Sequence, residues 1–476
     1  MTRLAELGLT LADVHLGEIE AEADRKLADY FVRTDYVVEA VEGPGTLFLG
    51  RKGSGKSALF SQLPRLIDEA RPGQGATILL TPDQYSWAAL KQYAELGLMA
   101  EQAHTNAWKY SLALEIAAHL VETDCEWGDE AKRALAELRT FLASNYGTDR
   151  PLFSKSAASL IKGLKSLDLS AFGFGVGVAR EGSEQAPVTP AVTKAILDRL
   201  DPVFREVSVV VALDRLDDSW DGSLDSSSLL VGLLKAARDL NNAFRGTPRI
   251  NGLQVLVFLR SDIYDSLHFD DKDKQRDTER RLVWSPDDLR KMLSLRLPGG
   301  VTADDLFEPE DMRGSIAPFN YIVKRTFLRP REILQFVGLC LQYAGRDAVQ
   351  ISKDQIRKAE EQYSQWKVDD LKQEYRKVLP HFERLLECLR QGVHRYDTTD
   401  GLSQLIEQKE PEIVEELGSR RILEMLFESS VIGIRPRDTG STRFRSEDPN
   451  LALPSTGAVY VHQGLYRGLG ITEARN

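Results

Sequence analysis

The sequence predicts an α/β protein with a parallel sheet in its first half and mostly helices in its second half. A β-branched run at 207–213 and a second largely apolar run at 253–259 lack the alternation of a half-exposed strand, so each is predicted to be a strand buried on both faces. A predicted helix over 229–244 separates them. Strands that alternate with helices are typical of a parallel sheet whose ligand lies at the carboxyl ends of the strands.

The composition is that of a folded globular protein. Its 476 residues predict two to four domains, and 42% are hydrophobic and 28% charged. The acidic N-terminus does not resemble a signal peptide, and no run approaches the roughly 18 apolar residues of a membrane span, so we expect a cytoplasmic protein without membrane contact. A net charge of −11 argues against general nucleic-acid affinity but permits a local basic patch. Three distant cysteines predict neither disulfides nor a zinc site.

A glycine-rich turn follows the first predicted strand, 46–49. It matches GxxxxGK[ST] at every fixed position and runs Gly50, Arg51, Lys52, Gly53, Ser54, Gly55, Lys56, Ser57. The N–H groups of such a turn, and of the helix that follows it, point at phosphates. Lys56 would contact the β- and γ-phosphates of a nucleotide, and the Ser57 hydroxyl would bind Mg²⁺. The predicted nucleotide site consists of Gly50, Gly53, Ser54, Gly55, Lys56, Ser57 and Ala58.

Acidic residues follow the buried strand 207–213. Asp214 stands where a Walker-B aspartate ends its strand, and there it would hold Mg²⁺ through water. Asp217 or Asp218 would polarise the attacking water, although either could instead cap a helix. The sequence contains no Asn-Lys-x-Asp motif of guanine-binding GTPases, so ATP is the expected nucleotide.

Arginines supply further candidates. Arg260, at the end of strand 253–259, would lie beside the γ-phosphate or on the surface. Arg329 and Arg331 stand at a predicted helix start, where positive charge is unfavourable unless an anion is near. Arg331 would therefore bind a phosphate or pair with an acid such as Glu332. Three more arginines are candidates for trans-acting fingers in an oligomer: Arg280, Arg281 and Arg296.

The remaining segments are predicted to be largely helical. Between the second strand, 77–80, and the strand 207–213, helices are predicted at 90–98, 107–121, 130–142 and 156–167, with a glycine-rich strand or hairpin at 171–178. Further helices are predicted at 17–32, from Ser285, from Arg331 and, as a solvated helix, over 353–376. Short helices after 378, a hairpin of 431–434 with 443–445, and a last strand 459–462 give the outline of a winged helix. His462 is expected to pack in this last part.

These segments define the expected organisation. It comprises a helical N-terminal segment (1–45), a P-loop core (46–280) with inserted helices (about 85–200), a helical lid (281–350), a linker helix (351–377) and a winged-helix-like domain (378–476).

The chain resembles the AAA+/STAND group of P-loop ATPases in five stretches followed by a winged-helix-like tail. The stretches are GRKGSGKS, VVVALDRLDD, VLVFLRSD, SPDDLRKMLSLRL and RPREIL. The order of these parts is similar to that of origin-recognition and replication-initiator ATPases. The stretches YFVRTDYVVEA and GRKGSGKSAL also resemble a bacterial family of P-loop ATPases. This family belongs to a broad group, and some relatives of that group serve in anti-phage defence. The resemblance implies that Lys56 and Ser57 are Walker A, Asp214 is Walker B, Arg260 or Ser261 lies near sensor 1 and Arg331 is sensor 2. It departs at Arg215, where AAA+ enzymes carry a glutamate that activates water.

Three functions remain open from the sequence. The first is an ATP- and Mg²⁺-dependent switch that hydrolyses ATP slowly and assembles with itself or with a partner effector protein. The second is a DNA-binding ATPase, because the predicted hairpin carries Arg435, Arg437, Arg443 and Arg445. The third is a small-molecule kinase, which the absence of a second recognisable substrate motif disfavours.

Overall fold

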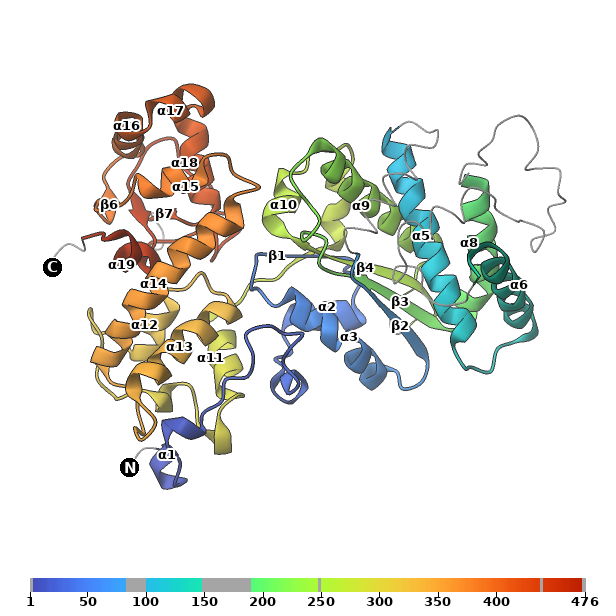
Figure 1. The fold of residues 1–476 in the computed structure, drawn as a ribbon, viewed down its shortest axis with the longest axis horizontal. Coiled ribbons are helices and arrows are strands. Elements are labelled where there is room, and N and C mark those ends of the chain that lie inside the picture. The colour runs from blue at the N-terminus through green and yellow to red at the C-terminus, as the bar shows by residue number, and fades with distance from the viewer. Residues whose placement is uncertain (1–2, 83–99, 148–189, 247–249, 437–439, 473–476) are drawn as a thin grey trace. The chain divides into compact units, whose positions relative to one another are not determined.

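The computed structural model describes residues 3–82, 100–147, 190–246, 250–436 and 440–472 (Figure 1). Contacts within the chain divide it into two units. The first, called here the α/β unit, comprises Arg33–Arg51 and Lys56–Leu282, and the second, the helical unit, comprises Met1–Val32, Lys52–Gly55 and Val283–Asn476. The middle of the glycine-rich turn thus groups with the helical unit. No described helix is long and apolar enough to cross a membrane.

The α/β unit is built on a parallel sheet, as the sequence predicts. Its described strands are β1 (Leu47–Gly50), β2 (Gly75–Leu80), β3 (Ser208–Leu213), β4 (Gly252–Arg260) and β5 (Glu279–Arg281). They lie in the order β2-β3-β4-β1-β5, and every adjacent pair is parallel. The two apolar runs form β3 and β4 in the buried middle of the sheet, and β4 lies between β3 and β1. The carboxyl ends of β1, β3 and β4 therefore meet at one edge.

Helices cover both faces of this sheet. They are α2 (Asp35–Glu42), α3 (Lys56–Ala70), α5 (Ala100–Glu122), α6 (Asp129–Tyr146), α8 (Pro190–Glu206), α9 (Leu224–Phe244), α10 (Ser261–Ser266) and the 3₁₀ helix η5 (Lys272–Thr278). Figure 1 shows α3 on one side of the sheet and α9 on the other, with α5 packed on α9, α6 and α8. The helices predicted at 107–121 and 130–142 are confirmed within α5 and α6. The predictions at 90–98, 156–167 and 171–178 lie outside the described residues.

The helical unit contains the predicted lid and linker helices. Its elements up to residue 375 are α1 (Arg3–Glu6), η1 (Leu11–Asp13), η2 (Leu27–Tyr30), α11 (Pro286–Ser294), η6 (Pro298–Gly300), η7 (Asp304–Leu306), α12 (Pro318–Val323), α13 (Pro330–Ala344) and α14 (Lys353–Tyr375). Helix α11 begins as predicted. The Ser285 hydroxyl accepts a hydrogen bond from the Asp288 N–H at 3.0 Å, and the Asp288 carboxylate accepts one from the Ser285 N–H at 3.3 Å.

The last hundred residues have the order of elements of a winged helix. They form α15 (Phe382–Glu387), β6 (Arg395–Tyr396), α16 (Thr399–Lys409), α17 (Pro411–Leu417), α18 (Ser419–Glu428), β7 (Ile432–Ile434), β8 (Val459–Val461), η8 (Gln463–Leu465) and α19 (Tyr466–Leu469). The three strands form an antiparallel sheet in the order β6-β8-β7. The hairpin predicted between 431–434 and 443–445 is confirmed in part. Ile434 and Arg443 form an antiparallel bridge with two backbone hydrogen bonds, of 3.0 and 2.7 Å, but the described ladder of β7 is with β8.

The helix predicted over 17–32 is also wrong. This segment contains turns and only the short η2. Its apolar spacing serves tertiary anchoring instead: the Tyr30 hydroxyl donates to the Asp24 carboxylate, and the Arg296 guanidinium lies 4.2 Å from the centre of the Tyr30 ring and donates to the Leu16 carbonyl. Gly17 has a φ of +76°, which breaks the helical backbone at the predicted start.

Helix α14 occupies the predicted place but is exposed on only part of its surface. Four of its polar side chains are buried: Glu360, Ser364, Lys367 and Glu374. The many charged residues of 353–376 suggested an exposed helix, but α13 covers one face of α14 and the segment of η8 and α19 covers another. The helices α2, α8, α10 and α12 and the strand β5 were not predicted. Strand β5 consists of charged residues only, so it has no apolar run that could indicate a strand.

Candidate nucleotide site

The glycine-rich turn joins a buried strand to a helix, as the motif requires. Strand β1 ends at Gly50 and α3 begins at Lys56. Gly53 and Gly55 have φ angles of +80° and +95°, a region that side chains other than glycine rarely adopt. The sequence therefore places glycine at the two positions where this turn needs positive φ.

Lys56 is a buried cation at the end of the turn. Its Nζ donates to the carbonyl oxygens of Gly50 at 2.9 Å and Arg51 at 3.3 Å. Burial lowers the pKa of Lys56, while the carboxylates of Asp217 and Asp214 oppose that shift. An ammonium group that bonds to neutral carbonyls in a buried place gains from a nearby anion, so this residue fits a phosphate.

Asp214 directly follows β3 and is 2% exposed. Burial raises the pKa of Asp214, and Lys56 and a hydrogen bond with the Ser57 hydroxyl oppose the shift. Its Oδ2 is buried and has no hydrogen-bond partner. A carboxylate oxygen without a partner beside a hydroxyl is the kind of oxygen pair that Mg²⁺ uses together with nucleotide phosphates and water. No cluster of three or more His, Cys, Asp or Glu side chains suited to a metal occurs among the described residues. A metal held by Asp214 and Ser57 would therefore take its other ligands from a nucleotide and from water.

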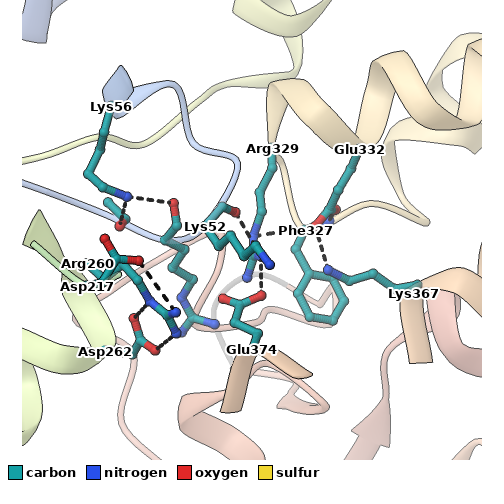
Figure 2. A network of polar contacts seen from close by, with 12 residues as sticks. Lys52, Lys56, Asp217, Arg260, Asp262, Phe327, Arg329, Glu332, Lys367 and Glu374 are labelled. Atoms are coloured by element: carbon teal, nitrogen blue, oxygen red, sulfur yellow. Dashed lines mark hydrogen bonds and ion pairs between the residues drawn. The ribbon is translucent and has the colours of Figure 1, made fainter. Parts of the chain in front are cut away.

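Asp217 and Asp218 have different surroundings. Asp218 accepts a hydrogen bond from Arg215 Nε at 2.8 Å on the surface. Asp217 turns toward Arg260, with 3.7 Å between its Oδ2 and the Arg260 Nη1 (Figure 2). Arg215 has a φ of +61°, a strained conformation that turns the chain sharply after Asp214. Of the two acids, the structure brings Asp217 into the charge group of Lys56 and Asp214.

Arg260 ends β4 and is held by two carboxylates. Its Nε donates to Asp262 Oδ1 at 3.1 Å, and its side chain, 13% exposed, also faces Asp217. The sheet order brings it to the same edge as Asp214, as predicted. The carboxylates neutralise its charge and fix its direction, so Arg260 is an oriented donor rather than a freely moving surface residue.

Arg331 lies against the turn through Gly53. A Cβ added to Gly53 would stand 3.1 Å from the Arg331 Cβ, and the Arg331 N–H lies 3.5 Å from the Gly53 carbonyl oxygen. Its Nε is buried without a hydrogen-bond partner, and no ion pair involves Arg331 among the residues that the structure describes. The predicted alternative, a pair with Glu332, is wrong because the Glu332 carboxylate faces Lys367 and Arg329 instead.

Arg329 begins a charge network that the sequence did not predict in full (Figure 2). Its Nη1 donates to the Glu374 carboxylate at 2.7 Å and to the Lys52 carbonyl oxygen at 3.0 Å. Lys367 donates to the Glu332 carboxylate at 2.5 Å, and that carboxylate lies 3.4 Å from Arg329 Nε. The two arginines at the start of α13 indicated an anion, and for Arg329 that anion is carboxylate. The sequence did not indicate that Lys367 and Glu374 would be buried, because their spacing on α14 is that of an ordinary charged helix.

The three candidate arginine fingers are all engaged within the chain. Arg280 Nε donates to Glu39 at 2.8 Å, Arg281 bonds the Asp265 carboxylate with two nitrogens, and Arg296 contacts Leu16 and Tyr30 as described above. These contacts explain the three side chains without a second copy of the chain.

Known proteins match this chain in two ways: one family matches a segment of it, and two proteins match more than nine-tenths of it. Residues 287–372 match the family described as "FunZ-associated C-terminal helical domain". A sequence 23% identical over 519 residues is the "Putative transposon gamma-delta 80.3 kDa protein" of Escherichia coli K12, with 98% of this chain and 68% of that protein covered. A solved structure, Cdc6p from Pyrobaculum aerophilum, is similar with a TM-score of 0.29 and 13% identity, covering 92% of this chain and 89% of that one. The family match spans α11 to α14, the segment that carries Arg329, Arg331 and Lys367.

Proposed function

We propose that this chain binds ATP with Mg²⁺ and acts as a nucleotide-driven switch with slow hydrolysis. The observation that carries the proposal is the combination of the glycine-rich turn with Lys56, Ser57 and the buried Asp214 carboxylate, one oxygen of which has no partner. Backbone N–H groups of the turn would hold the phosphates, and Lys56 would exchange its bonds to its own loop carbonyls for phosphate oxygens. Ser57 and Asp214 would hold Mg²⁺, which supplies charge neutralisation at the phosphates when bound.

Hydrolysis would depend on how water is activated. The residue after Asp214 is Arg215, whose side chain bonds Asp218. Asp217 is the acid that faces the group of Lys56 and Arg260, so we assign it the role of polarising water, with Arg260 oriented by Asp262. An arrangement without an acid directly after Asp214 supports slow turnover, which suits a switch that persists in its ATP state.

The test measures ATP binding, ATP hydrolysis and particle mass on the full chain. We expect wild type to bind ATP and to hydrolyse it slowly, and to gain mass with ATP if it assembles with itself. Asp214→Ala should abolish Mg²⁺-dependent hydrolysis, whereas Asp198→Ala, which changes an exposed acid paired with Lys194 on α8, should not. ATP binding that is equal in wild type and in Lys56→Ala would refute the proposal. Asp217→Asn and Asp218→Asn then separate the two acids, because only the first should lower turnover.

DNA binding through the C-terminal sheet is a second candidate function. The Tyr460 ring on β8 has two guanidinium groups beside it, Arg435 at 4.8 Å and Arg395 at 5.8 Å from its centre. Arg395 also pairs with Asp397 and both arginines are exposed. Arginines beside an aromatic ring are a common arrangement for contacts with phosphates and bases. Duplex DNA binding that weakens with salt, and weakens further in Arg395→Gln/Arg435→Gln, would support this function; no binding by wild type at low salt would exclude it.

We propose that the switch serves in anti-phage defence and acts through a partner effector protein. This setting is suggested by the resemblance of the P-loop segment to ATPases, some of whose relatives serve in such defence. Bacteria that carry the wild-type chain with its neighbouring genes should then resist phage better than bacteria that carry Lys56→Ala. Equal plating of phage on both would remove this setting while leaving ATP binding untouched.

A further inference from the structure

Three consecutive carbonyl groups of the glycine-rich turn face hydrogen-bond donors from the helical unit. Arg329 Nη1 donates to the Lys52 carbonyl oxygen at 3.0 Å, and Trp284 Nε1 donates to the Ser54 carbonyl oxygen at 2.8 Å. Between them, the Arg331 N–H approaches the Gly53 carbonyl oxygen at 3.5 Å. These three donors are called here the carbonyl clamp. The residues Lys52–Gly55 of the turn belong to the helical unit, as the three donors of the clamp do.

The clamp fixes the direction of the N–H groups in the turn. In a trans peptide plane, the carbonyl of one residue and the N–H of the next point in opposite directions. Donors that fix the carbonyls of Lys52, Gly53 and Ser54 therefore also fix the N–H groups of Gly53, Ser54 and Gly55, each of which points away from the donor on its own peptide plane. We infer that Arg329 and Trp284 are positioning residues that pre-arrange these three N–H groups for the phosphates, an inference that rests on the proposed ATP site.

Arg329 is built to hold a fixed direction. It is 4% exposed, and its guanidinium lies between Glu374 and Glu332, with the Phe327 ring 5.7 Å away. Burial lowers the pKa of Arg329, but the two carboxylates outweigh burial and raise it, so the group stays charged. A planar guanidinium held by carboxylates loses little further freedom when it also holds the Lys52 carbonyl. The network thus supplies the turn with a charged donor that does not need to be ordered when a nucleotide arrives.

Trp284 supplies the second donor from a rigid place. It is 6% exposed and directly precedes Ser285, the N-cap residue of α11, whose capping box fixes this part of the backbone. A Cβ added to Gly55 would lie 3.7 Å from the Trp284 ring, so the ring also supports the back of the turn. Phenylalanine at this position would keep an aromatic side chain and remove the donor, together with part of the ring that faces Gly55.

The experiment compares two clamp variants with one control. Trp284→Phe removes one donor, and Arg329→Met/Glu374→Gln removes the other without leaving a buried carboxylate alone. The control, Arg325→Met/Glu360→Gln, removes an equally buried ion pair, with 5% and 3% exposed side chains, that does not contact the turn. The readouts are calorimetric affinity for ADP with Mg²⁺ and amide hydrogen exchange of the turn in nucleotide-free protein.

We expect Trp284→Phe to weaken ADP binding about two- to tenfold and the Arg329 double variant about ten- to a hundredfold, from the usual strength of neutral and charged hydrogen bonds. Both should speed amide exchange of the turn before any nucleotide is added, and the control should do neither. Unchanged exchange and affinity in Trp284→Phe, which should fold normally, would overturn the inference, as would equal losses in the control. If wild type binds no nucleotide, the proposed function fails, and faster exchange of the turn in the clamp variants alone would still show that the clamp orders it.

Discussion

The polar groups around Lys56 and those around Arg329 are both buried, but their charges are paired in different ways. Lys56 bonds to neutral carbonyls, and Asp214 keeps a buried carboxylate oxygen without a hydrogen-bond partner. Around Arg329, each charge meets an opposite charge: Arg329 faces Glu374, and Lys367 faces Glu332. Both sets also contain buried polar atoms without a hydrogen-bond partner: Asp214 Oδ2 in the first, and Arg329 Nε, Arg329 Nη2 and Glu374 Oε1 in the second. The contrast therefore rests on charge, because a phosphate would give the Lys56 ammonium a hydrogen-bonded anion, whereas the cations around Arg329 already face carboxylates.

The same difference separates two arginines that are two residues apart. Arg329 pairs with two carboxylates and bonds one carbonyl, while no ion pair involves Arg331 among the described residues; both arginines have a buried Nε without a hydrogen-bond partner. The start of α13 thus carries one structural cation and one that remains available. The following variants test this division between structural and available charges. They are given in order of decreasing expected effect.

The largest expected effect is on stability, from Arg329→Met alone. It leaves the Glu374 carboxylate buried without its cation, so the free energy of unfolding should fall by about 3–5 kcal/mol. Arg329→Met/Glu374→Gln should recover most of that loss. Urea denaturation measures both, and equal losses in the single and double variants would show that packing rather than charge explains the effect.

Lys56→Ala should behave in the opposite way. The buried ammonium costs desolvation in nucleotide-free protein, and this cost offsets its attraction to Asp214 and its two bonds to carbonyls, so the free energy of unfolding should fall much less than in Arg329→Met. Affinity for ATP with Mg²⁺ should fall about ten- to a hundredfold, the range for a lost charged hydrogen bond. Paired melting and calorimetry give both values, and a loss of stability in Lys56→Ala as large as in Arg329→Met would place this lysine with the structural charges.

Arg331→Gln should sharpen the comparison at the start of α13. We expect about tenfold weaker ATP binding with little change in stability, because no ion pair is lost within the described chain. Arg357→Gln, which removes an exposed arginine paired with Asp354 on α14, is the control. A loss of stability without a change in affinity would assign Arg331 to the fold.

The smallest effect concerns pH and His462. Burial lowers the pKa of His462 well below 6.5, and the nearby cations Lys367, Arg325 and Arg329 lower it further. The unfolded chain therefore binds a proton that the folded chain does not, and stability should fall as pH drops below about 6.5, by up to about 1.4 kcal/mol per pH unit. His462→Gln should flatten this slope in urea denaturation between pH 7 and 5, and the exposed His268→Gln should not. An unchanged slope in His462→Gln would contradict the assignment.

The sequence by itself determined the parts that depend on local chemistry. The largely apolar runs at 207–213 and 253–259 specify buried strands, the glycine positions specify a turn with positive φ, and Ser285 with Asp288 specifies a helix start. The parallel direction of the strands then follows the general tendency of alternating strands and helices to form parallel sheets. This was enough to place Lys56, Ser57 and Asp214 in one candidate site.

Only the tertiary structure decided which charges are paired. The charged helix 353–375 looked exposed, and 17–32 looked helical, because composition and spacing carry no information about what packs against a segment. Glu374 and Lys367 become a buried counter-charge and cation only when the start of α13 lies against them, and the Lys52 and Ser54 carbonyls gain donors only through residues some 230 to 280 positions away in the sequence. Such long-range partners depend on packing, so no local pattern can predict them.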